Sequence, residues 1–153
     1  MESVWDYPRP PRLEPTDRHI VVRHSGRVVV DSRRALRLLE TSHPPVYYLP
    51  PGDVDDTVLV RTSGSSFCEW KGLAEYWDVV IGGRRLAKVA WSYPDPVEAY
   101  GALRDHFAFY AHPFDECTVD GEKVVPQPGG FYGGWITGDL VGPFKGAPGT
   151  AGW

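Results

Sequence analysis

The chain has 153 residues, enough for one domain that buries about 70% of the surface of its unfolded chain. Its 20 acidic and 16 basic residues leave a net charge of −4, which excludes a general attraction to the phosphates of nucleic acids. The two cysteines, Cys68 and Cys117, form no Cys-x-x-Cys pair, so the usual signatures of a zinc site and of thioredoxin-type redox chemistry are missing.

The first residues and the hydropathy pattern give an expected location. Met1 is followed by Glu2, Asp6 and several prolines rather than by a basic stretch and an apolar run. No segment approaches the roughly 18 apolar residues that would span a bilayer. We therefore expect a cytoplasmic protein with no membrane partner, no nucleic-acid partner, no cofactor and no zinc.

Residues 1–18 and the segment that follows differ in pattern. Four closely spaced prolines disfavour a helix in 1–18 and predict an extended arm that Trp5 and Tyr7 anchor. From residue 19, β-branched runs at 20–22 and 27–30 flank Ser25-Gly26, where glycine supplies the positive φ of a tight turn. A β-hairpin is the firmest local prediction.

The next segment predicts a short helix. Asp31 and Ser32 are suitable N-caps, and the apolar residues Ala35, Leu36, Leu38 and Leu39 repeat at spacings of three and four before Pro44. The nearby Arg33, Arg34 and Arg37 make a local basic patch, which we interpret as a solvated face rather than an anion site.

The middle of the chain predicts strands. We expect a strand at residues 46–49. A second strand at 58–60 should lead through a loop at 62–66 into a third strand. Residues 76–81 and 84–91 flank Gly82-Gly83 and predict a second hairpin, because glycine tolerates any backbone angle in the turn.

The last third predicts one helix, more strands and a tail. Asp95-Pro96 begins a helix to about Asp105, with aspartate as the cap and proline in the first turn. Residues 106–110 and 116–119 are expected strands, and 123–125 return after the turn 120–121. Residues 126–153 are rich in glycine and proline but carry too many aromatic residues for a disordered linker, so we expect a tail docked on the domain.

These elements predict a mainly β fold, α+β with one short helix. One helix cannot supply the crossovers of a parallel sheet, so the sheets should be antiparallel. The expected organisation is an extended arm at 1–18, a domain at 19–125 and a docked tail at 126–153.

Several motifs together resemble the family known as domain of unknown function 427. They are the run 34–45, Tyr47, Tyr48 and Pro50, the Cys68-x-Trp70-Lys71-Gly72 motif, the Ala90-Trp91-Ser92-Tyr93-Pro94-Asp95-Pro96 motif, and the segment 106–110. The similarity covers roughly residues 19–125. The resemblance implies a β-tent-like, Mss4-like fold in which two antiparallel sheets meet at an angle. Fold similarity by itself does not transfer a function.

The chain departs from two properties associated with that resemblance. Many β-tent proteins hold zinc with two Cys-x-x-Cys pairs, and this sequence has neither pair. A nucleotidyltransferase-like label would require two carboxylates one residue apart to hold magnesium. Here Gly64-Ser65 is followed by Asp78, but position 80 is Val80. We therefore expect neither the zinc site nor nucleotidyl transfer in this chain.

A dense aromatic cluster at residues 68–94 predicts a ligand pocket. We expect Trp70, Tyr76, Trp77, Trp91 and Tyr93 as walls, Glu69 and Lys71 as polar anchors, and Tyr48 nearby. If residues 69–71 form a strand, Glu69 and Lys71 point to one side and Trp70 to the other, so all three cannot line one wall. The competing interpretation is that these rings are solid core between sheets.

The sequence thus leaves three functions open. The first is a module that binds an unidentified small molecule, and aromatic faces suit a planar heterocycle or nucleobase-like ligand. The second is an enzyme with Cys68 as nucleophile, assisted by Lys71 and by His43 or His106, with Cys117 as the resolving thiol of a sulfoxide reductase; Glu69 would oppose ionisation of Cys68. The third is a protein-interaction domain, and a homodimer is also left open.

Overall fold

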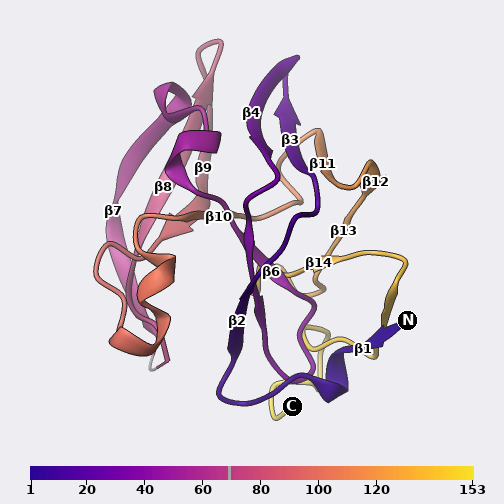
Figure 1. Cartoon of the computed structure of the whole chain (residues 1–153). Coiled ribbons are helices and arrows are strands. Elements are labelled where there is room, and N and C mark those ends of the chain that lie inside the picture. The colour runs from indigo at the N-terminus through magenta and orange to yellow at the C-terminus, as the bar shows by residue number, and fades with distance from the viewer. Residues whose placement is uncertain (69) are drawn as a thin grey trace.

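A computed structural model describes residues 1–68 and 70–153 and has a mainly β fold. Two four-stranded antiparallel sheets form most of it, and Figure 1 shows them side by side. The first has the order β10-β9-β8-β7, from β7 (Leu59–Cys68), β8 (Gly72–Ile81), β9 (Arg84–Ser92) and β10 (Phe107–Phe109). The second has the order β12-β11-β3-β4, from β3 (Ile20–His24), β4 (Arg27–Ser32), β11 (Glu116–Val119) and β12 (Glu122–Lys123).

Three smaller sheets complete the fold. An antiparallel three-stranded sheet has the order β2-β5-β6, with β2 at Arg12–Pro15, β5 at Leu36–Leu39 and β6 at Val46–Tyr48. The antiparallel pair β13 (Val125–Pro126) and β14 (Trp135–Ile136) lies in the C-terminal segment. The pair β1 (Glu2–Ser3) and β15 (Leu140–Val141) is parallel and joins the two ends of the chain.

The main core lies between the two four-stranded sheets. Strand alternation turns the β-branched residues of β3 and β4, such as Val22 and Val30, toward Val79, Ala90 and Phe109 of the other sheet. Both predicted hairpins are present, and their turns have the positive φ values that the sequence required, 51° and 76° at Ser25-Gly26 and 57° and 79° at Gly82-Gly83.

The helix predicted after Asp31 is wrong: Leu36–Leu39 is strand β5, between β2 and β6. Leu38 packs in the cluster that contains Tyr48 and Trp91, whereas Leu39 faces the other way and packs with Val4. Because both faces of this strand are covered, consecutive leucines are buried, and the resulting apolar run imitates a helical spacing.

The predicted helix from Asp95 to Asp105 is replaced by the 3₁₀ helix η4 (Glu98–Leu103). Its N-cap is Val97 rather than Asp95, because the Val97 N–H donates to the Lys71 carbonyl at 3.0 Å and holds that residue extended. Tyr100 interrupts the helical backbone, and its hydroxyl donates to the Pro11 carbonyl at 2.6 Å. Tertiary hydrogen bonds therefore override the local capping pattern.

The loop predicted at 62–66 is part of strand β7. A register irregularity between Arg61 and Ser65 absorbs the extra residues, and Gly64 takes a positive φ of 97° there. The remaining helical segments are single turns, η1 (Val4–Asp6), η2 (Pro51–Asp53) and η3 (Asp56–Val58). Over the described residues, every helix is too short or too polar to span a bilayer.

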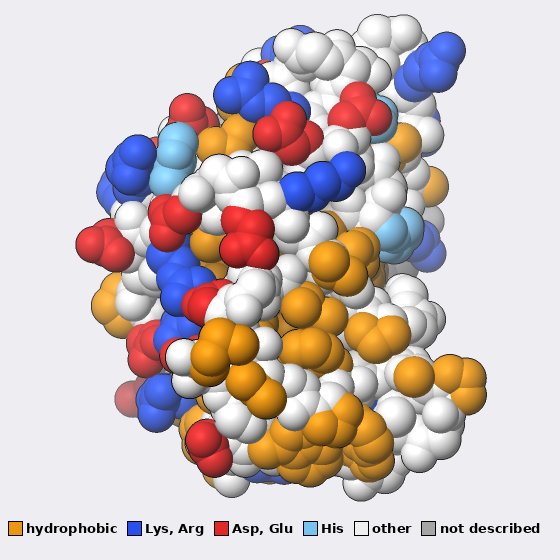
Figure 2. Space-filling model, turned by 90° about the vertical axis from the view of Figure 1, so that its right-hand side faces the viewer, with side chains coloured by type: hydrophobic (Ala, Val, Ile, Leu, Met, Phe, Trp, Pro, Cys, Tyr) orange, Lys and Arg blue, Asp and Glu red, His pale blue; other side chains and the backbone are white. Residues whose placement is uncertain are grey.

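Both chain ends pack on the sheets. Strand β2 of the N-terminal arm pairs with β5, Tyr7 is buried, and the Trp5 indole N–H donates to the Pro143 carbonyl at 2.8 Å. In the C-terminal segment, Trp135 is 1% exposed and lies in the main core. Figure 2 shows the side of the molecule on which the N-terminus lies, where apolar side chains gather in the lower half.

Candidate ligand-binding site

A cavity of about 440 Å³ lies where the first four-stranded sheet, the three-stranded sheet and the C-terminal segment meet. Strands β5 to β9 and the segments that follow β5, β7, β9 and β10 supply most of its walls, and residues 127–133 and Lys145 supply the rest. It is lined by Leu38, Glu40, His43, Pro44, Val46, Tyr48, Ser66, Phe67, Cys68, Trp70, Lys71, Ala74, Tyr76, Trp91, Tyr93, Tyr110, Gln127, Phe131, Tyr132, Gly133 and Lys145. The aromatic rings of the central cluster therefore border an opening.

Four buried or half-buried rings form one continuous wall. The Trp91 ring lies 4.8 Å from that of Tyr110 and 6.5 Å from that of Tyr48, and Tyr48 lies 6.4 Å from Tyr93. The Trp91 indole N–H donates to the Tyr48 hydroxyl at 3.3 Å. Rings that contact one another in tilted and edge-on pairs have few accessible rotamers, so the wall is rigid.

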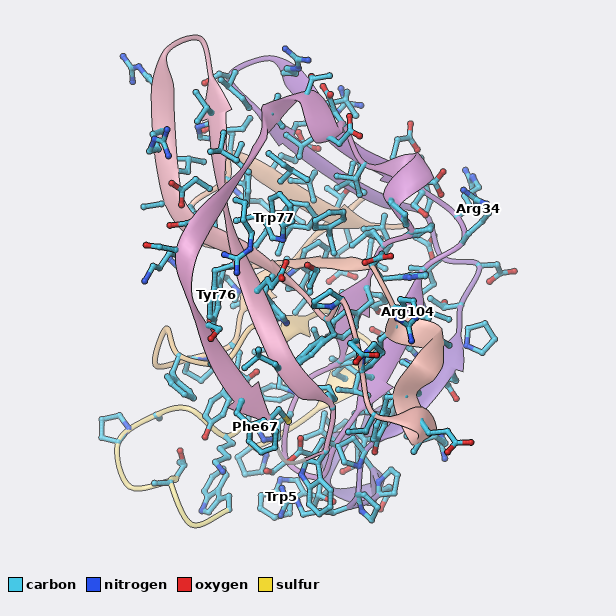
Figure 3. All side chains as sticks on the ribbon, turned by 90° about the vertical axis from the view of Figure 1, so that its left-hand side faces the viewer. Trp5, Arg34, Phe67, Tyr76, Trp77 and Arg104 are labelled. Carbon is cyan, nitrogen blue, oxygen red and sulfur yellow. The ribbon has the colours of Figure 1, made fainter. Side chains whose placement is uncertain are left out.

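Strand alternation decides which residues of β8 reach the cavity. Tyr76 pairs with Trp91 across β8 and β9, so both rings lie on the cavity face. The neighbouring Trp77 lies on the opposite face, where its ring is 5.4 Å from Phe107 and its indole N–H donates to Ser92 Oγ at 2.9 Å. Figure 3 shows Tyr76 and Trp77 on this sheet and Phe67 near its lower end. Trp77 therefore does not line the cavity.

The turn between β7 and β8 brings two predicted residues to the same wall. Trp70 and Lys71 both line the cavity, so the prediction that they face opposite sides is wrong. They lie in a turn rather than in a strand, where the two-residue alternation does not hold. Gly72 closes this turn with a φ of 109°. Glu69, predicted as a polar anchor, lies outside the described residues.

Lys71 places a positive charge inside the cavity. Its Nζ is 5.6 Å from the centroid of the Tyr93 ring. Burial disfavours this charge, but the acidic groups of Tyr48, Cys68 and Glu40 outweigh that effect and raise the pKa of Lys71. Burial also raises the pKa of Tyr93, so that hydroxyl stays protonated beside the ammonium.

His43 is held as a neutral imidazole at another wall. The Gly134 N–H donates to Gln127 Oε1 at 3.0 Å, which fixes the amide so that its Nε2 donates to His43 Nδ1, also at 3.0 Å. The proton of the neutral ring is therefore on Nε2, which is 3.7 Å from Glu40 Oε2. This network orients His43 toward Glu40.

Burial is the main reason that His43 stays neutral, and nearby cations add to it. Burial, together with Lys145, Arg9 and Lys71, lowers its pKa to about 4, and Glu40 opposes them. Glu40 is itself paired with Arg9, whose Nη2 is 3.4 Å from its carboxylate. His43 is the only histidine among the described residues that line the cavity, and its imidazole has a strong tendency to stay uncharged.

The structure separates the residues proposed for cysteine chemistry. Cys68 lines the cavity together with Lys71, and its thiol is one of the groups that raise the pKa of Lys71. Cys117 instead lies in the main core, where burial raises its thiol pKa to about 12. Both thiols are free. His106 does not line the cavity, and its Nδ1 is 3.1 Å from the Arg104 carbonyl.

Other charged groups do not form a second candidate site. A shallow depression of about 590 Å³ near Arg33 also includes Arg34 and Arg37, but Arg34 pairs with Asp53 at 2.8 Å and Arg37 pairs with Glu14 at 2.7 Å. In the part of the chain that the structure describes, no cluster of three or more His, Cys, Asp or Glu side chains could hold a metal ion. The aromatic cavity is therefore the strongest candidate.

Sequence reasoning missed the part of the site that comes from distant segments. Glu40, Tyr110, Gln127, Tyr132 and Lys145 all line the cavity. Glu40 and Tyr110 lie in segments that carry the family resemblance, and the only signal for Gln127, Tyr132 and Lys145 was the density of aromatic residues after position 125, which indicated a docked tail. That signal could not indicate which tail residues reach the cavity, because the contacts join positions about a hundred residues apart or lie beyond the last regular strand pattern.

Comparison with protein families identifies the chain. The sequence profile described as a domain of unknown function, DUF427, matches residues 12–120. The chain therefore belongs to the DUF427 family, as its motifs indicated. No curated protein matches it.

Proposed function

We propose that this DUF427 protein binds a small molecule with a planar ring, such as a heterocycle or nucleobase-like compound, in the aromatic cavity. The observation that carries the proposal is the cavity of about 440 Å³ bordered by Trp70, Tyr76, Trp91 and Tyr93. Ligand pockets typically have volumes of about 300 to 1,000 Å³ and combine aromatic walls with few polar groups.

The arrangement of groups favours a flat ligand. Trp91 and Tyr110 provide a rigid wall on which a planar ring can stack, and the half-buried Trp70 and Tyr76 provide further faces. Polar groups lie at separate places on the walls, among them the Tyr93 hydroxyl and the His43–Gln127 pair. Such groups can orient a ring that carries donors and acceptors at its edge.

The proposal is tested by ligand-detected NMR with adenine and naphthalene-2-carboxamide as probes. We expect at least one probe to bind, and we expect Trp70→Ala and Trp91→Ala each to weaken binding by about fivefold or more, because one ring stacking on an aromatic side chain contributes about 1–3 kcal/mol. Mass spectrometry of small molecules released from the purified protein would identify the natural ligand.

Controls separate loss of binding from loss of fold. Trp70 lies in a turn and is half-buried, so Trp70→Ala should keep the dispersed NMR spectrum of the folded chain. Trp5→Ala removes a partly exposed indole outside the cavity and should leave binding unchanged. Unchanged affinity in both the Trp70 and Trp91 variants would refute the assignment of the walls.

A cysteine-dependent reaction is the second candidate, because Cys68 and the ammonium group of Lys71 line the same cavity. Such a neighbour stabilises a thiolate. Cys117 is too deeply buried to serve as a resolving thiol, which leaves chemistry at Cys68 alone. Alkylation by iodoacetamide distinguishes this candidate: labelling of Cys68 no faster than that of free cysteine at neutral pH would contradict it.

A further inference from the structure

We propose that the ligand of the aromatic cavity carries a negatively charged group, a carboxylate or a phosphate, which Lys71 and Lys145 bind while the ring stacks on the aromatic wall. This inference rests on the proposed function and defines its ligand class more narrowly. Three observations support it: the charges that line the cavity, the positions of the two ammonium groups, and the lack of a carboxylate partner for either of them among residues 1–68 and 70–153.

The described lining of the cavity carries a net positive charge. It contains two ammonium groups, those of Lys71 and Lys145, and one carboxylate, that of Glu40. Arg9 lies outside the lining and pairs with Glu40 at 3.4 Å, which offsets that negative charge. The surplus is notable because the whole chain has a net charge of −4. A cavity of this sign attracts anions.

The two ammonium groups act on the same part of the cavity. Lys71, Lys145 and His43 all line this one cavity, and both lysines contribute to the low pKa of His43. Lys145 reaches the cavity from the C-terminal segment, whereas Lys71 comes from the turn between β7 and β8. Charges from two sides of a cavity can bind one anionic group together.

Within residues 1–68 and 70–153, neither ammonium group has a carboxylate within 4.0 Å. The arginines of the shallow depression differ in this respect, since Arg34 and Arg37 are bound to Asp53 and Glu14. Charge pairing thus leaves both ammonium groups of the cavity available for an anion, whereas in the depression only Arg33 has no carboxylate within 4.0 Å among the described residues.

The same geometry disfavours a cationic ligand. Lys71 Nζ lies 5.6 Å from the Tyr93 ring, and Lys145 Nζ lies 5.3 Å from the Tyr132 ring. Aromatic faces that could attract a ligand cation therefore already hold the protein's own cations. A ligand ammonium would meet two like charges, whereas a ligand carboxylate would meet two opposite ones.

The test compares three ring-matched probes by isothermal titration or ligand-detected NMR: naphthalene-2-carboxylate, naphthalene-2-carboxamide and 2-naphthyltrimethylammonium. We expect the carboxylate to bind about tenfold to a hundredfold more tightly than the carboxamide, the range for charge-assisted hydrogen bonds in a partly buried site. The ammonium probe should bind most weakly. Added sodium chloride should weaken only the carboxylate.

Variants assign the effect to the two lysines. Lys71→Met and Lys145→Met should each reduce the preference for carboxylate over carboxamide and leave the carboxamide affinity within about twofold, because methionine keeps most of the apolar stem. Lys71→Arg should retain the preference. Lys123→Met removes an exposed lysine outside the cavity and should change nothing.

The outcomes separate the two proposals. Equal affinity for all three probes, or tightest binding of the ammonium probe, would overturn the anion inference while the binding function stands. Carboxylate preference that persists in both lysine-to-methionine variants would overturn the assignment to Lys71 and Lys145. Failure of all three probes and of adenine to bind would overturn the proposed function and the inference with it.

Discussion

At the scale of single residues, the tautomer and protonation state of His43 depend strongly on its surroundings in the fold. The sequence places it before two prolines, which favours a local hydrogen-bonding residue over a base. In the folded protein, the amide of Gln127 fixes its tautomer from a position 84 residues away. Only 8% of the residue is exposed, so protonation would place a buried positive charge near the cations of Lys145, Arg9 and Lys71.

Acid should destabilise the protein in part through His43. In the unfolded chain its pKa is near the ordinary 6.5, whereas in the folded protein it is about 4. Between these values the unfolded state binds more protons, so the contribution to stability is complete above pH 6.5 and is lost as the pH falls toward 4. The full loss would be about 3 kcal/mol.

Urea unfolding of the wild type and of His43→Gln, at pH values above and below 6.5, measures this contribution. The free energy of unfolding of the wild type should fall more steeply with acid than that of the variant. Carboxylates with lowered pKa values, such as Asp53 and Asp139, titrate in both proteins and cancel in the difference. Parallel pH profiles would show that His43 does not resist protonation.

At the scale of elements, the residues of the turns predicted secondary structure better than the spacing of apolar residues did. The hairpin turn at Gly82-Gly83 needs two consecutive positive φ values, and only glycine adopts them without strain, so the sequence was sufficient there. The leucines of β5 wrongly indicated a helix, because a strand covered on both faces shows no alternation of apolar and polar residues. Knowing that Val4 and Leu140 cover the second face requires the fold.

Substitution of Gly83 tests the hairpin. A Cβ there meets no atom within 4 Å, so Gly83→Ala should be destabilised by the backbone conformation alone, by about 1 kcal/mol. Gly83→Asn should lose less, because asparagine adopts positive φ more readily than alanine. The midpoint of urea unfolding reports both values.

Gly101→Ala is the matched control. Its Cβ also meets open space, but its φ is not positive, so the change should be neutral or slightly stabilising. If Gly83→Ala were as stable as Gly101→Ala, the turn could not have the conformation described for it.

At the scale of the whole molecule, the C-terminal segment connects the core to the cavity. Trp135 lies against Tyr47 with ring centroids 5.7 Å apart, and its indole N–H donates to the Phe109 carbonyl at 3.0 Å. The same segment places Tyr132 and Lys145 in the cavity lining. The packing of this segment on the sheets therefore also positions Tyr132 and Lys145 at the cavity that we propose binds a ligand.

Trp135→Ala should cost about 3–5 kcal/mol of unfolding free energy, since it leaves a large cavity and an unpaired carbonyl in the core. It should also weaken probe binding in the aromatic cavity, because the segment that carries Lys145 loses its anchor. Urea unfolding and probe titration measure the two effects.

Trp153→Ala provides the comparison. Trp153 is half-buried, and its ring centroid lies 5.2 Å from that of Trp5 in an edge-on pair, so its loss should cost no more than about 1 kcal/mol. Equal effects of the Trp135 and Trp153 substitutions would contradict the docking of the tail through Trp135.

The sequence by itself determined the mainly β class, both hairpins and the family, and it indicated several of the rings that border the cavity, because turn residues and strand patterns act over a few positions. Tertiary structure decided the rest. It turned Trp77 away from the cavity, brought Trp70 and Lys71 together in a turn, and added Glu40, Gln127 and Lys145 from distant segments. These outcomes depend on contacts between remote parts of the chain, and local pattern carries no information about such contacts.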